Sequence, residues 1–231
     1  MSIVNARSTK DELIVEVDSL GGLPPGLVVP ESQRGAALVR VPKVAVVPHQ
    51  RLVVAARGAT LFHTVLAGPM SIAPFDSPDD LMDHVPDFLK ESHRMFLQLA
   101  APTPDLRKLD NDGVIGIYSP RLGRIRALTF QVTSQGEVTI DELSKDGGID
   151  VHLTPWFDEL EQVEADALST RGSIAAAPAE QLRLVHKHHP DLMTGGEIVS
   201  VRLTRHGIST RVLPEPNWRP QPWSLPQGLQ S

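Results

Sequence analysis

Residues 1–19 of the chain read MSIVNARSTKDELIVEVDS, and the fold prediction starts from this stretch. Ile3 to Ala6 and Leu13 to Val17 are short apolar runs, and the polar residues Ser8 to Asp11 separate them. Two apolar runs around a short polar turn are typical of neighbouring strands joined by a tight connection. We therefore predict that the chain begins with a strand, a turn and a second strand, which is followed at once by Asp18.

Beyond this hairpin, strand-like and helix-like segments alternate. We predict a loop from Leu20 to about Gly35, because this stretch is rich in glycine and proline, which interrupt both strands and helices. Further strands are predicted at residues 37–41, 44–47, 52–56, 114–118, 123–132, 197–203 and 208–213. Helices are predicted at residues 61–66, 77–100, 155–168 and 179–188, with Pro86 kinking or restarting the second of them.

The order of strands, helices, strands, helices and strands favours a two-sheet sandwich covered by helix pairs, although periodicity alone is also compatible with another α/β layout. A chain of 231 residues is most simply one domain, which we place at residues 1–213. Residues 214–231 contain five prolines, Pro214 included, and two of the three tryptophans, Trp218 and Trp223. We interpret them as a C-terminal tail that is too short to form a domain.

Composition excludes several classes of function. A net charge of −6 gives no electrostatic footprint for nucleic acid. The absence of cysteine excludes disulfides, thiolate catalysis and cysteine-ligated zinc. The first residues lack the apolar core of a signal peptide, and no apolar run approaches the length of a membrane span. We therefore expect a cytoplasmic protein that contacts neither a membrane nor nucleic acid.

The first sixty positions resemble the start of proteasome β subunits and of the bacterial HslV peptidase. In that family a processed nucleophile opens a strand, and after a turn and a second strand comes an aspartate. Here Ser2 takes the place of the nucleophile, and Asp18 follows it sixteen residues later. Lys43 takes the place of the family's lysine, fifteen residues before Gly58. The segments around Gly116 to Ala127 and Gly195 to Ile208 are similar to the family's central hairpin and closing strand pair.

The resemblance implies an α+β fold of the N-terminal-nucleophile hydrolases, a four-layer αββα sandwich. It implies an amide-bond hydrolase, and most simply a peptidase, in which Ser2 attacks, Lys43 tunes the nucleophile and Asp18 orients Lys43. Backbone N–H groups near Gly58 would form the oxyanion hole. Relatives stack into rings, so the resemblance also implies a homo-oligomer that acts on a peptide or protein substrate.

The chain also departs from the family pattern. The motif begins with Ser rather than the usual Thr, and the loop between Asp18 and Lys43 is longer than in proteolytic relatives. The family's conserved serine near a glycine-rich turn has no secure counterpart, and Ser134 and Ser173 are the candidates. Two alternatives therefore stay open. One is a proteasome-like scaffold that has lost activity and binds a partner, and the other is an unrelated α/β binding domain.

The chemistry of Ser2 supports the enzyme hypothesis independently. A free N-terminal serine carries a hydroxyl nucleophile and an α-amine base, whose pKa of about 8 suits neutral pH. Its small side chain permits removal of the initiator methionine, so no propeptide is needed. The plainer interpretation is that Ser2 is only a tolerated second residue, and that Asp18 and Lys43 form a structural ion pair or lie on the surface.

The cluster His186-Lys187-His188-His189, followed by Asp191, has spacing that a metal site could use. Lys187 lies inside the cluster, however, and cations are in any case favoured at the end of a helix. We therefore expect no metal site. No nucleotide-binding motif is present, so we expect no cofactor.

Overall fold

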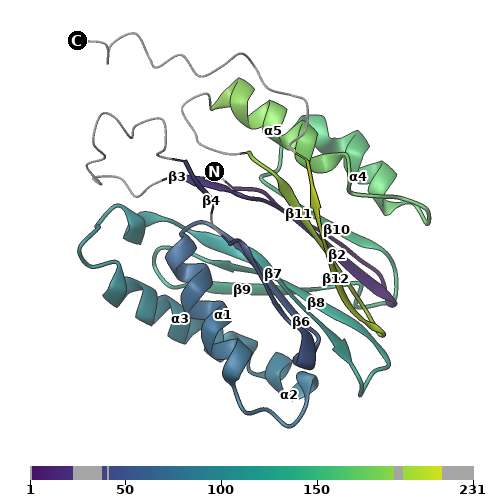
Figure 1. Cartoon of the computed structure of the whole chain (residues 1–231), viewed down its shortest axis with the longest axis horizontal. Coiled ribbons are helices and arrows are strands. Elements are labelled where there is room, and N and C mark those ends of the chain that lie inside the picture. Colours follow the sequence, from purple (N-terminus) through teal and green to yellow (C-terminus); the bar gives the residue numbers. More distant parts are fainter. Residues whose placement is uncertain (1, 23–37, 41, 190–194, 215–231) are drawn as a thin grey trace.

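The computed structural model describes residues 2–22, 38–40, 42–189 and 195–214 (Figure 1). Within these ranges the chain forms a mixed α+β fold with two five-stranded antiparallel sheets and a two-stranded ribbon. No helix in these ranges has the length and apolar character needed to cross a membrane. The predicted tail at 215–231 and most of the predicted glycine-proline loop, at 23–37, lie outside the described residues.

The first sheet has the order β10-β1-β2-β11-β12. Its strands are β10 (Asp150–Thr154), β1 (Val4–Ser8), β2 (Glu12–Asp18), β11 (Ile198–Thr204) and β12 (Gly207–Leu213). The predicted N-terminal hairpin is confirmed, since Val4 pairs with Val17 and Ser8 with Leu13. The predicted closing pair is also confirmed, and β11 lies directly beside β2.

The second sheet has the order β5-β6-β7-β8-β9. Its strands are β5 (Val44–Val47), β6 (Leu52–Arg57), β7 (Asn111–Ser119), β8 (Arg124–Val132) and β9 (Val138–Leu143). The ribbon consists of β3 (Leu20–Gly22) and β4 (Leu38–Arg40). The apolar run of β6 is buried on both faces, as a central strand covered on two sides requires.

Helices cover the outer faces of both sheets (Figure 1). On the outer side of the second sheet lie α1 (Thr60–Ile72), α2 (Pro78–Asp83) and α3 (Val85–Leu99). On the outer side of the first sheet lie α4 (Glu161–Leu168) and α5 (Ala177–His188). Separate apolar clusters fill the space between the sheets and the space under each helix group, so both sheets are packed on two faces.

Three sequence predictions need correction. The helix predicted at 155–168 begins only at Glu161, after a 3-10 turn at Asp158–Leu160. The helix predicted at 77–100 restarts at Pro86 as expected, since α2 ends at Asp83 and Pro86 lies in the first turn of α3. The strand predicted at 114–118 begins earlier, because β7 starts at Asn111, and the loop predicted from Leu20 opens with strand β3 instead. Strands β9 and β10 were not predicted, because their alternation is short and mostly polar.

Gly113 in β7 is required by close packing. A Cβ at this position would lie 2.0 Å from the carbonyl oxygen of Ala55 and 2.8 Å from Phe130 Cζ. The backbone of the neighbouring strand has no freedom to move away, because β6 is hydrogen-bonded within the sheet. The glycine therefore allows the inner strands of the second sheet to approach each other under α1.

We predict that Gly113→Ala lowers the free energy of unfolding by about 1–3 kcal/mol, the usual cost of overpacking a core. Gly68→Ala is the matched control, because nothing lies within 4 Å of its added Cβ and alanine favours a helix. Denaturant midpoints of both variants check this. A Gly113→Ala protein as stable as the parent would contradict the packing argument.

A polar row crosses the outer face of the first sheet beneath α5. Asn5 Nδ2 donates to Gln181 Oε1 at 2.6 Å, and Gln181 Nε2 donates to the carbonyl of Pro155 at 3.0 Å. Glu16 pairs with Asn5 across the strands and is 3% exposed. Burial raises the pKa of the Glu16 carboxyl above its ordinary value of 4.5, and a hydrogen bond with Ser200 opposes this rise. Its Oε2 has no hydrogen-bond partner among the described residues.

We predict that Glu16→Gln stabilises the protein at neutral pH by on the order of 1–3 kcal/mol, the penalty for burying an unsatisfied group. Because the pKa of Glu16 is higher in the folded chain than its ordinary value of 4.5, the contribution of Glu16 to stability is fully present below pH 4.5. This contribution is lost as pH rises through the folded-state pKa. The advantage of the variant should therefore vanish in acid and grow toward neutral pH. Unfolding measured across pH checks this, with the exposed Glu137→Gln as control. A pH-independent difference would contradict it.

Candidate active site

The carboxylate of Asp18 joins four segments at one end of the sandwich. It lies at the end of β2 and is fully buried. Its Oδ1 accepts a hydrogen bond from the N–H of Ile3 at 2.7 Å. Its Oδ2 accepts from the N–H of Gly195 at 3.2 Å and forms an ion pair with Lys43 Nζ at 2.7 Å. The predicted partners Asp18 and Lys43 are thus brought together in the core, and neither lies on the surface.

Lys43 reaches this carboxylate from the other sheet. It precedes β5, and its carbonyl accepts a hydrogen bond from the N–H of Ala56 in β6 at 3.0 Å. Its side chain is 4% exposed. Burial lowers the pKa of Lys43 below its ordinary value of 10.5, and the charge and hydrogen bond of Asp18 oppose this shift. A buried ammonium of this kind can lower the pKa of a neighbouring hydroxyl or amine.

Ser2 lies directly before the Ile3 N–H that Asp18 holds, and it is half-buried. Ile3 packs on the outer face with Leu182 and Ile198, whereas Val4 belongs to the apolar cluster between the sheets. Since side chains alternate along an extended chain, Ser2 is expected on the inner face, the side from which Lys43 approaches. Met1 lies outside the described residues.

Gly58 lies at the same end of the second sheet, between β6 and α1. Its φ of +106° and its contact with the next loop both exclude a side chain, because a Cβ would lie 2.5 Å from Asn111 Oδ1. The N–H of Ala59 donates to Asn111 Oδ1 at 2.8 Å. Of the two successive amides, the one of Ala59 is therefore engaged, and the one of Gly58 is the better candidate oxyanion donor.

The two candidate serines do not join this group. The N–H of Ser134, in the loop after β8, donates to Asp110 Oδ1 at 2.7 Å. Ser173 is exposed, and its hydroxyl accepts from the N–H of Ala175. Neither has a hydrogen bond to Asp18 or Lys43 in the described structure.

The histidine cluster lies elsewhere, at the end of α5. His188 stacks on Phe157, and both Lys187 Nζ and His188 Nε2 lie within 3.5 Å of Glu159 Oε1. Among the described residues no group of three or more side chains could hold a metal ion. Asp191 lies outside these residues.

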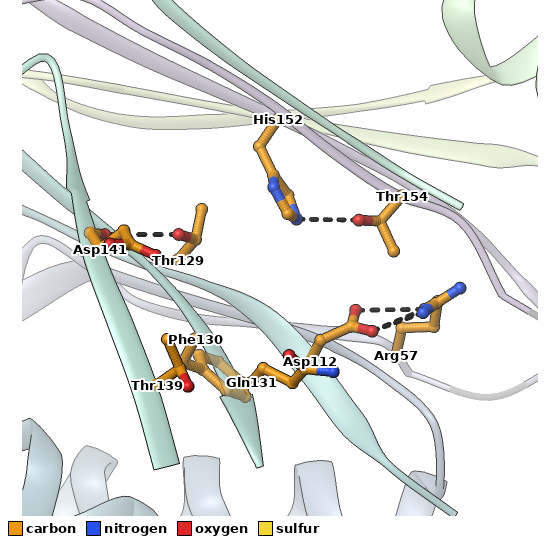
Figure 2. Close-up of a pocket in the computed structure, with 9 residues that line it drawn as sticks. All are labelled: Arg57, Asp112, Thr129, Phe130, Gln131, Thr139, Asp141, His152 and Thr154. Atoms are coloured by element: carbon orange, nitrogen blue, oxygen red, sulfur yellow. Dashed lines mark hydrogen bonds and ion pairs between the residues drawn. The ribbon is translucent and has the colours of Figure 1, made fainter. Parts of the chain in front are cut away.

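A polar pocket of about 350 Å³ opens between the sheets near the same end, and sequence analysis missed it (Figure 2). Its lining residues are Arg57, Asp112, Thr129, Phe130, Gln131, Thr139, Asp141, His152 and Thr154. They come from β6, β7, β8, β9 and β10. The only signal in the sequence is the alternation of Asp150, His152 and Thr154, which also suits a solvent-facing strand.

We predict that Asp18→Asn lowers the free energy of unfolding at pH 7 by about 3–5 kcal/mol, because it leaves a buried ammonium without its counter-ion. Adding Lys43→Met should recover much of this loss, since the double variant removes both charges of the pair. Loss of Asp18 removes the charge and the hydrogen bond that oppose the effect of burial, so the pKa of Lys43 lies further below 10.5 in the variant than in the parent, and the variant gains more stability as pH rises. The difference in unfolding free energy between the parent and Asp18→Asn should therefore shrink as pH rises toward 10.5.

Denaturant unfolding of the parent, both single variants and the double variant gives the coupling energy directly. A double variant as unstable as Asp18→Asn alone would contradict a buried ion pair as the source of the loss. It would point instead to the hydrogen bonds from Ile3 and Gly195.

Comparison with known proteins identifies the fold. No protein-family model matches the chain, and no curated protein sequence is significantly similar to it. Among solved structures, Anbu (ancestral beta-subunit) from Yersinia bercovieri aligns with a TM-score of 0.57 at 11% identity, over 94% of this chain and 88% of its own. The Anbu (Gly-1) mutant from Hyphomicrobium sp. strain MC1 aligns with a TM-score of 0.54 at 10% identity, over 93% and 87%. Anbu is a proteasome-like N-terminal-nucleophile hydrolase family, so the chain shares a proteasome-like fold with it.

Proposed function

We propose that the chain is an amide-bond hydrolase, and specifically a peptidase, of the proteasome-like N-terminal-nucleophile type. In this proposal the fold is the four-layer αββα sandwich of that class. The helices on the outer faces of the two sheets support this arrangement (Figure 1). Support for the activity comes mainly from one observation. The Asp18 carboxylate holds both Lys43 Nζ and the N–H that follows Ser2.

The proposed reaction begins when removal of Met1 exposes the α-amine of Ser2. The Ser2 hydroxyl attacks the amide carbonyl of the substrate, and the α-amine accepts the hydroxyl proton. The buried Lys43 ammonium favours this step because a nearby positive charge stabilises the developing alkoxide. The amine product leaves with a proton from the α-ammonium, and water then hydrolyses the ester on Ser2. The N–H of Gly58 is assigned to the oxyanion.

Asp18 acts in this scheme as a positioning residue. Its two oxygens are engaged by Lys43 and by the main chain on both sides of the site. The main-chain bond to Ile3 limits where Ser2 can lie, and the ion pair limits where Lys43 can lie. Such preorganisation is what a nucleophile at a flexible chain end requires. Assembly into a homo-oligomeric ring and a peptide or protein substrate stay predictions from the family resemblance.

The test is the intact mass of protein with a native N-terminus, before and after reaction with a β-lactone acylating probe. We expect loss of Met1 and one stoichiometric adduct, which Ser2→Ala abolishes because it removes the attacking oxygen. Ser173→Ala is the matched control and should leave the adduct unchanged, since Ser173 is exposed and, among the described residues, its hydroxyl bonds only to the neighbouring Ala175 N–H.

Lys43→Met should slow the acylation by about 10²–10³-fold, the usual cost of removing one group that stabilises developing negative charge. Retained Met1 with no adduct would overturn catalysis by Ser2. It would leave the alternative, an inactive proteasome-like scaffold that binds a partner.

A further inference from the structure

The space between the two sheets is apolar along most of its length but becomes polar at one corner. Valine, leucine, isoleucine and alanine side chains of both sheets fill the apolar part. Alternation from Ala127 places Thr129 and Gln131 on the same inner face of β8, and their register partners in β9 are Asp141 and Thr139. On the facing sheet, His152 and Thr154 of β10 pair with Ala6 and Val4 of the inner cluster.

These polar side chains point at one another across a cavity (Figure 2). His152 Nε2 and Thr154 Oγ1 are 3.0 Å apart, and the Thr129 hydroxyl donates to the main-chain oxygen of Asp141 at 3.4 Å. A polar inner face costs stability unless water or a ligand satisfies it. A volume of about 350 Å³ lies within the range of pockets that hold small ligands or single side chains.

The charges in the pocket do not balance. Arg57 and Asp112 neutralise each other, because Nε and Nη2 of Arg57 donate to Asp112 Oδ2 at 3.0 Å and 2.5 Å. Burial lowers the pKa of His152, while the charge of Asp112 opposes this, so the imidazole is neutral at pH 7. The carboxylate of Asp141 is left, and no cation among the described residues forms an ion pair with it. The pocket therefore carries a net negative charge.

The pocket lies beside the candidate active site. Thr154 pairs with Val4, two residues after Ser2, and Arg57 is the residue before Gly58. The strand ends that position the nucleophile and the oxyanion donor therefore also form the near wall of the pocket. A substrate held at Ser2 could place a neighbouring side chain in it.

We propose that this pocket binds the guanidinium or primary ammonium group of a basic side chain, with Asp141 as counter-ion and the hydroxyls and amide of Thr129, Thr154 and Gln131 as hydrogen-bond acceptors. Its use as a substrate subsite rests on the proposed function, whereas binding of the cation does not. Peptides with arginine or lysine next to the cleaved bond would then be the preferred substrates. Anionic side chains would be excluded by like charge.

The test uses the full chain carrying Ser2→Ala, so that no acylation interferes. Agmatine, which carries a guanidinium and an ammonium, is titrated while backbone amide shifts are recorded, and acetate serves as the anionic probe. We expect saturable agmatine binding with shifts centred on residues 129–131, 139–141 and 152–154. Asp141→Asn should weaken it at least about tenfold, as loss of a charged hydrogen bond does.

Asp11→Asn is the matched control, because Asp11 is exposed in the turn between β1 and β2, away from the pocket. It should leave agmatine affinity unchanged, and Thr129→Val should weaken it without charge change. Absence of saturable binding, tighter binding of acetate, or equal affinity in Asp141→Asn would each overturn the pocket proposal. Agmatine binding to the Ser2→Ala protein, together with no adduct on Ser2 in the parent protein, would overturn only the proposed catalysis.

Discussion

The buried contact between Asp18 and Lys43 determines how the two sheets meet at the end of the molecule that holds the candidate site. Asp18 belongs to the first sheet and Lys43 leads into the second, yet their charged atoms lie 2.7 Å apart and both side chains are buried. Two buried charges tolerate little displacement, because separation would leave each without compensation in a medium of low dielectric constant. The main-chain donors of Ile3 and Gly195 complete the coordination, so the start of β1 and the entry to β11 are held at the same point.

This arrangement is more consistent with a catalytic site than with an ion pair that only stabilises the fold. Replacing a buried ion pair by apolar side chains is often neutral or stabilising, so a pair that serves only the fold has little advantage over two hydrophobic residues. Here the pair fixes the residue that follows Ser2 and brings an ammonium to the inner face on which Ser2 is expected. Gly58 adds a main-chain donor at the same end, at a position where a Cβ would collide with Asn111.

The buried Glu16 and the polar pocket lie on opposite faces of the first sheet, and the packing treats their polar groups differently. On the outer face, α5 covers Asn5 and Glu16, its Gln181 accepts a hydrogen bond from Asn5, and burial raises the pKa of the Glu16 carboxyl. On the inner face at the corner by β10, polar side chains surround an open volume and keep access to solvent or ligand. We therefore infer a binding role for the pocket residues, which have open volume beside them, and not for Glu16, which is packed beneath α5.

The sequence alone determined the N-terminal hairpin, the closing strand pair and most of α3 and α5, because their apolar periodicity is regular and their turns are short. The family resemblance, rather than any local pattern, predicted that Ser2, Asp18, Lys43 and Gly58 form one site. The structure pairs Asp18 with Lys43, and the catalytic roles of the four residues stay predictions. The pocket was decided by tertiary structure only. Its residues come from five strands, and at positions such as Thr129, Asp141 and His152 the alternation suits an exposed face equally well. Only the stacking of β10 over β8 and β9 turns those side chains toward one another, and no local pattern in a single strand encodes that long-range contact.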